Sequence, residues 1–203
     1  MKIKKGDIVA RKSYNKDIIF IVDRVLSLVN NTSIAILKGL TVRIEADAPI
    51  TDLDIVDKKI AYKNMRYVED RINRRIEETK KRDNRIYEKE GNIRTGRILH
   101  LDGDRRYGEK AVRYYRKLGL NAIVRNIAEN RQPEVIIPLL QRYNPDILVI
   151  TGHDAMIKNG RNYNNIYNYR NSRHFANTVR EARKWGETEE KLVIFARCMP
   201  KFF

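Results

Sequence analysis

The stretch Ile147–Asp154, with the sequence ILVITGHD, decides how the second half of this chain folds. Four aliphatic residues in a row predict a short buried strand, and threonine, glycine, histidine and aspartate follow where that strand should end. A second apolar run, Leu192–Ala196, is followed by Arg197 and by Cys198, the one cysteine of the 203 residues. If both runs are parallel strands of one sheet, His153 and Cys198 stand at the same edge, where open α/β sheets hold their functional residues.

Strands and helices alternate around these two runs. Strands are expected over 98–101, 120–127, 147–150 and 192–196, and helices over 105–118, 133–143 and 172–185. Gly119 and Gly186 should close two of the helices, and Pro138 should kink or shorten another. This alternation predicts a parallel sheet with right-handed crossovers, in which the common strand order 2-1-3-4 makes the third and fourth strands neighbours. The Asn- and Tyr-rich stretch 159–171 is long for a connection, which favours a functional loop.

The whole chain should comprise three segments. Residues 1–57 contain short β-rich runs broken by turn residues, which is typical of a small SH3-like β-barrel. Residues 58–94 predict a charged helical linker with one narrow apolar stripe. Residues 95–203 predict the α/β domain, which we expect to be incomplete at its C-terminus.

The composition limits the class of protein. A hydrophobic content of 42% suffices for a core, and the net charge of +16 permits binding to nucleic acid without requiring it. A single cysteine excludes an internal disulfide, and Met1–Lys5 leads into Gly6 and Asp7 rather than into an apolar signal segment. We therefore expect a cytoplasmic protein with no membrane partner.

A cysteine peptidase site follows from the expected sheet. A thiol attacks a carbonyl only as the thiolate, so Cys198 as nucleophile needs a base, and His153 is placed to be that base. Gly152 should let the backbone turn sharply beside the histidine, and N–H groups of that turn could stabilise the oxyanion. The alternative for Cys198 is a small buried side chain without chemistry. His100 lies inside the first strand, where a role in the core or at the edge of the sheet is expected.

Asp102 and Asp104 also belong to the same edge. We expect them to cap the following helix and to order the site, whereas a receiver-like domain that binds Mg²⁺ or phosphate would need further partners. No zinc-ligand spacing, Walker sequence or dinucleotide glycine pattern is present, so no metal or cofactor is expected.

Several blocks of the sequence resemble the YabG family of sporulation-specific proteases. They are Lys4–Tyr14, Leu37–Pro49, Gly96–Asp104 and Leu148–Asp154, and the similarity covers essentially the whole chain. The resemblance implies a cysteine peptidase of spore-forming bacteria that processes spore coat and related precursor proteins after basic residues, with self-processing and association with the spore coat. The order of His153 and then Cys198 is similar to that in the caspase and gingipain clan, and implies that fold, with these residues as base and nucleophile.

The resemblance breaks at the nucleophile. Family members read Ala-Cys-Gln-Ser and continue, whereas this chain reads Ala196-Arg197-Cys198-Met199-Pro200. The codons TGC ATG CCA AAG encode Cys-Met-Pro-Lys, and the same bases read from the second position encode Ala-Cys-Gln. We therefore expect a shift of reading frame just before the nucleophile, which displaces the cysteine by about one residue, and a chain that is inactive as written.

A second class of function stays open from the sequence. In this reading the small barrel and the charged helix bind nucleic acid or a spore polymer, and the α/β part is structural. Affinity that falls steeply with salt would distinguish it from a peptidase.

Overall fold

The computed structural model of the chain describes residues 3–27, 32–90, 95–154, 166–189 and 192–199. They divide into two compact units, one ending at Arg75 and the other beginning at Ile76, within the long helix α1 (Lys58–Glu90). The chain is mixed α/β, with an antiparallel sheet in the first unit and a parallel sheet in the second.

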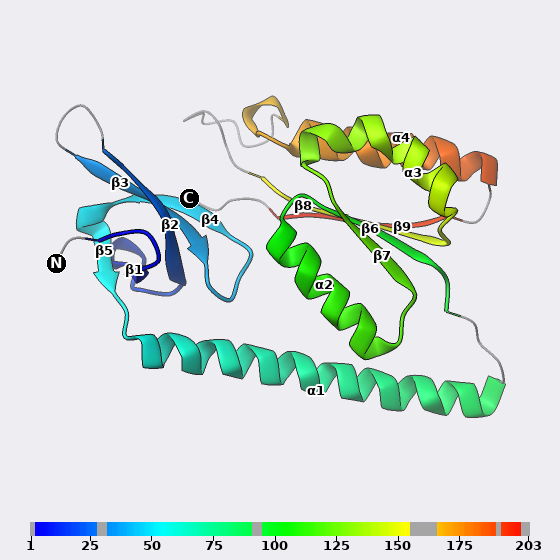
Figure 1. Ribbon diagram of the computed structural model, residues 1–203, viewed down its shortest axis with the longest axis horizontal. Coiled ribbons are helices and arrows are strands. Elements are labelled where there is room, and N and C mark those ends of the chain that lie inside the picture. Colours follow the sequence, from blue (N-terminus) through cyan, green and yellow to red (C-terminus); the bar gives the residue numbers. More distant parts are fainter. Residues whose placement is uncertain (1–2, 28–31, 91–94, 155–165, 190–191, 200–203) are drawn as a thin grey trace. The chain divides into compact units, whose positions relative to one another are not determined.

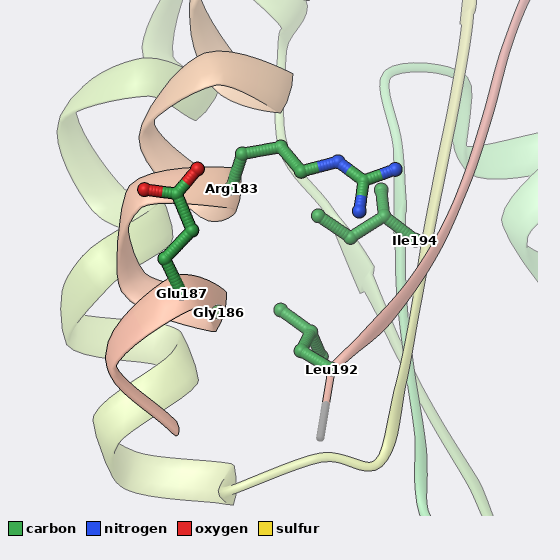
Figure 2. A pocket seen from close by; sticks show the side chains of 5 residues that line it. All are labelled: Arg183, Gly186, Glu187, Leu192 and Ile194. Atoms are coloured by element: carbon green, nitrogen blue, oxygen red, sulfur yellow. The ribbon is translucent and has the colours of Figure 1, made fainter. Parts of the chain in front are cut away.

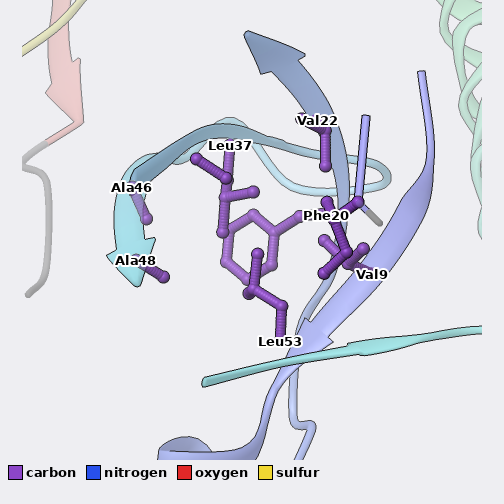
Figure 3. Packing of buried hydrophobic residues seen from close by; sticks show 9 residues of the cluster. Val9, Phe20, Val22, Leu37, Ala46, Ala48 and Leu53 are labelled. Carbon is purple, nitrogen blue, oxygen red and sulfur yellow. The ribbon is translucent and has the colours of Figure 1, made fainter. Parts of the chain in front are cut away.

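The described part of the first unit contains one antiparallel sheet, in the order β4-β3-β2-β1-β5. Its strands are β1 (Ile8–Arg11), β2 (Ile19–Ser27), β3 (Ser33–Gly39), β4 (Glu45–Pro49) and β5 (Leu53–Ile55). Buried residues alternate along β2 and β3, as a strand with one covered face requires, and Phe20, Leu37 and Leu53 project into one core (Figure 3). An antiparallel β-rich module is thus confirmed, while its SH3-like character stays a prediction.

Asp52 joins two turns of this unit. Its carboxylate accepts hydrogen bonds from the hydroxyl of Ser13 at 2.7 Å, from the Ser13 backbone N–H at 2.9 Å and from Arg11 Nε at 3.2 Å. These bonds, led by that of the Ser13 hydroxyl, lower the pKa of Asp52 from its ordinary value.

Four parallel strands form the described sheet of the second unit, in the order β7-β6-β8-β9. They are β6 (Ile98–Asp102), β7 (Ala122–Asn126), β8 (Ile147–His153) and β9 (Val193–Met199). This is the predicted order 2-1-3-4, and β8 and β9 are neighbours as expected. Both strands continue beyond the predicted apolar runs, because their polar ends still pair with each other.

Helices cover both faces of this sheet (Figure 1). Helix α2 (Arg105–Leu118) lies on one face, and α3 (Gln132–Tyr143) and α4 (Ser172–Glu189) lie on the other. Leu99, Leu101, Leu148 and Ile150 of the strands pack with Ile136, Leu140 and Ala182 of α3 and α4 in a fully buried core.

Three residues were expected to end, kink or shorten a helix. Gly119 ends α2 in the left-handed conformation at φ 69°, as predicted. Gly186 does not end its helix, since α4 continues to Glu189, so that prediction was wrong. Pro138 was expected to kink or to shorten its helix; it does not shorten it, because α3 runs past it to Tyr143, and the kink stays a prediction. In both helices the packing of the apolar face outweighs the local preference of one residue.

Candidate active site

The carboxyl ends of β8 and β9 bring the predicted histidine and cysteine to the same edge of the sheet. The backbone register pairs Gly152 with Cys198 and His153 with Met199. Adjacent strands are about 4.8 Å apart. Position 199 is therefore one strand spacing from position 153, and position 198 is its diagonal neighbour. The predicted juxtaposition of strand ends is therefore present.

The register also decides which face of the sheet each position occupies. Leu148 and Ile150 lie on the face covered by α3 and α4, and residues alternate between faces along a strand. Position 152 and its register partner 198 fall on that same face. Position 153 and its partner 199 fall on the opposite face, which α2 covers in part. Positions 153 and 198 are thus on adjacent strands but on opposite faces of the sheet, and position 199 is the register partner of position 153.

Gly152 does not turn the chain as predicted. It lies inside β8, paired with Cys198, and β8 continues to His153. A Cβ at Gly152 would lie 3.4 Å from Glu129 Cγ and 3.6 Å from Phe175 Cδ2. A methyl group there would make ordinary van der Waals contact with Glu129 and Phe175, which pack beneath the strand.

Asp104 takes the capping role expected of it, whereas the ordering of a catalytic site by Asp102 and Asp104 stays a prediction. Asp104 caps α2 by accepting a hydrogen bond from the Arg106 backbone N–H at 2.8 Å. Asp102 is 1% exposed, and its carboxylate accepts the Asp104 N–H at 2.7 Å and the Thr151 hydroxyl at 2.8 Å. Together they connect the end of β6 to α2 and to β8, so both aspartates order the edge of the sheet.

Asp154 secures the segment that follows the histidine. It is 2% exposed, and its carboxylate accepts the Asn171 backbone N–H at 2.8 Å and the hydroxyl of Ser172, the first residue of α4. These bonds join the end of β8 to the start of α4. Most of the predicted loop 159–171 lies outside the described residues.

Glu129 is a buried acid at this edge that the sequence analysis missed. It is 7% exposed and follows β7 in a short 3₁₀ turn. Its carboxylate fills the space beside Gly103, where a Cβ would come within 2.3 Å of Glu129 Cδ. The glycine directly after Asp102 was a signal that something approaches the chain closely there.

Two hollows lie away from this edge. One, of about 440 Å³, is lined by Arg183, Gly186, Glu187, Leu192 and Ile194 between α4 and the start of β9, at the amino end of that strand (Figure 2). The other, on α1 in the first unit, is lined by Lys59, Tyr62, Lys63, Arg66, Tyr67 and Asp70. The first lies at the wrong end of the strands for the predicted chemistry, and the second is a basic helical face.

Among the described residues, no group of three or more histidine, cysteine or acidic residues could hold a metal ion. None of the helices in that part of the chain is both long and apolar enough to cross a bilayer.

Comparisons with known proteins were made for the whole chain. The YabG peptidase U57 family matches residues 4–202. The sporulation-specific protease YabG of Bacillus subtilis (strain 168) is 36% identical over 216 residues, an alignment that covers 100% of this chain and 74% of that protein. No solved structure matches the chain. The resemblance of the sequence blocks is therefore confirmed, and the chain belongs to the YabG peptidase U57 family, a family of sporulation proteases.

Proposed function

We propose that this chain has the framework of a cysteine endopeptidase that processes spore coat and related precursor proteins, with His153 as the general base. The family match supports peptidase activity in sporulation. The cysteine type, the substrates, self-processing and a place in the sporulating cell or at the spore coat are our proposals. A nucleic-acid-binding or spore-polymer-binding module is not favoured, because the match to a peptidase family covers almost every residue.

One observation carries the proposal, namely the pairing of His153 with position 199 at the edge of a parallel sheet. Directly paired residues of adjacent strands belong to the same face, within reach of an imidazole and a thiol. We therefore assign the nucleophile to position 199, the frame-shifted neighbour of Cys198. A cysteine there, preceded by alanine at 198, would restore the Ala-Cys pair of the family.

The reaction follows the chemistry of a thiol and an imidazole. The imidazole takes the thiol proton, the thiolate attacks the substrate carbonyl, and the proton then goes to the leaving amine as the peptide bond breaks. Water hydrolyses the resulting thioester and regenerates the thiol.

This assignment explains why the chain as written should not cleave peptides. Position 198 is the register partner of Gly152 and not of His153, so it does not share a face of the sheet with position 153. Removing the general base from an enzyme of this kind costs roughly 10²–10⁴-fold in rate. Met199, directly opposite His153, offers no thiol.

The experiment compares three purified chains with a denatured protein substrate. The chain as written and a Cys198→Ala/Met199→Cys variant are assayed together with the same variant carrying His153→Ala. We expect cleavage only by the second chain, and we expect resequencing of codons 197–200 to show the Ala-Cys reading in the neighbouring frame. Cleavage by the chain as written, with loss on Cys198→Ala alone, would assign the nucleophile to Cys198 instead.

A further inference from the structure

Four polar side chains form a continuous hydrogen-bonded series on the face of the sheet that α2 covers. The Tyr115 hydroxyl lies 3.1 Å from His100 Nδ1, and His100 Nε2 lies 2.8 Å from Thr151 Oγ1. Thr151 Oγ1 lies 2.8 Å from Asp102 Oδ2. His100 is 5% exposed and Asp102 is 1% exposed, so the series lies in the interior of the second unit.

The direction of these hydrogen bonds follows from the Asp102 carboxylate, at which the series ends. The Thr151 hydroxyl donates its one proton to Asp102, so it must accept from His100 Nε2–H. His100 Nδ1 then accepts from the Tyr115 hydroxyl. Burial raises the pKa of Tyr115, which keeps that phenol protonated and able to donate. The network thereby assigns a proton to His100 Nε2.

The carboxylate at the end of this series is held in place from two sides. Asp102 Oδ1 accepts the Asp104 N–H at 2.7 Å, and the Asp102 carbonyl accepts the Ile127 N–H at 3.0 Å and the Asn126 side-chain amide at 2.9 Å. Thr151 is therefore bonded to a rigid acceptor on the neighbouring strand.

Thr151 connects this network to the proposed base. It stands two residues before His153 in β8, so the two positions share a face of the sheet, about 6.6 Å apart along the strand. An apolar trio in place of His100, Thr151 and Asp102 would fill the space without the desolvation cost of a buried carboxylate and imidazole. The sequence nevertheless has a polar network here, two residues along β8 from His153. This suggests a role other than filling the core.

We propose that Asp102, Thr151 and His100 are positioning residues for His153. They fix the end of β8 against β6, so that position 153 is held opposite position 199 in one arrangement. The expected effect on kcat rests on the proposed function. The expected effect of the network on His153 does not. None of the three residues is assigned a contact with substrate.

The first test uses the chain as it exists. With only three histidines, ¹⁵N-histidine labelling gives three sets of ring signals, assigned by single substitution of each histidine. We expect Thr151→Val to shift both the His100 and the His153 ring signals, and Thr151→Ser, which keeps the hydroxyl, to leave both nearly unchanged. Thr178→Val is the matched control, because Thr178 is a fully buried threonine whose hydroxyl bonds the His174 carbonyl inside α4.

The second test measures kinetics in the Cys198→Ala/Met199→Cys chain. Thr151→Val should lower kcat roughly 10- to 100-fold with KM changed less than about twofold, as expected when a reacting group is misplaced. Thr151→Ser should recover most of kcat. If Thr151→Val does not fold, Tyr115→Phe replaces it, because this variant removes the hydrogen bond to His100 at the other end of the series. The same histidine signals and the same kcat are then measured.

The outcomes separate this inference from the proposed function. If Thr151→Val shifts the His100 signals but leaves those of His153 and kcat unchanged, the network only stabilises the fold and the inference is overturned. If no chain cleaves any substrate, the proposed function fails, and the histidine signals still decide whether the network positions His153.

Discussion

Replacing Gly103 with alanine should destabilise the second unit, because Glu129 occupies the space that the new methyl group needs. A Cβ at residue 103 would lie 2.3 Å from Glu129 Cδ, 2.3 Å from Oε2 and 2.4 Å from Oε1. These atoms end a flexible side chain, so Glu129 yields before the backbone does. The cost is that of moving a buried carboxylate away from its surroundings, about 1–3 kcal/mol.

This cost can be measured through Trp185, the one tryptophan of the chain, which packs against the core of the second unit. Thermal unfolding followed by its fluorescence should show Tm lowered by roughly 3–12 °C. Gly108→Ala is the control, since a Cβ there meets nothing closer than Val124 Cγ1 at 3.5 Å and lies inside α2. Alanine at this helical position should stabilise by about 0.5–1 kcal/mol.

The two substitutions therefore have opposite signs, and an unchanged or raised Tm for Gly103→Ala would refute the reasoning. A double-mutant cycle identifies the cause. In a Glu129→Ala background, alanine at position 103 should cost less than in the parent chain, with a coupling of about 0.5–3 kcal/mol. Absence of coupling would show that Glu129 does not determine the effect.

Three further predictions concern single contacts. Asp104→Ala should cost about 1 kcal/mol in the same fluorescence assay, because the Arg106 N–H loses its cap, and Asp104→Ser should cost less. The pKa of Asp52 lies below its ordinary 3.8, mainly through the Ser13 hydroxyl, so its stabilising contribution is present above that pH and is lost as pH falls through the lowered value. Asp52→Asn should reduce the acid sensitivity of the first unit, measured by circular dichroism between pH 5 and pH 2, and an unchanged acid profile would contradict this. Asp154→Ala should speed amide hydrogen exchange at the start of α4 while exchange in α2 stays as in the parent chain.

Much of the second unit could be predicted because its signals are local. Asp104 and Gly119 stand directly at the two ends of α2, and the sequence predicted both ends of this helix correctly. The order of strands is the common 2-1-3-4 order of open α/β sheets, which was assumed from the alternation of strands and helices. The extension of α4 past Gly186 and of β8 past Ile150 could not be found in this way, because tertiary pairing and packing decide them.

The site was predicted only in part, for a related reason. The sequence indicated that His153 and Cys198 would reach the same edge, but the face that each position occupies depends on the register between β8 and β9. A change of register by one residue would exchange the two faces. The burial of Glu129 and Asp154 likewise depends on segments distant in sequence, so their acidic side chains gave no sign of it.

Alkylation of a single thiol tests the central claim most directly. Iodoacetamide is reacted at pH 6 with the chain as written, whose thiol is at 198, and with the Cys198→Ala/Met199→Cys chain, each with and without His153→Ala. An imidazole on the same face raises the thiolate fraction, so the thiol at 199 should react about tenfold faster than that at 198, after allowance for the weaker nucleophilicity of a more acidic thiol. His153→Ala should remove this advantage. Equal rates at the two positions, or a faster reaction at 198 that depends on His153, would contradict the assignment of the nucleophile to position 199.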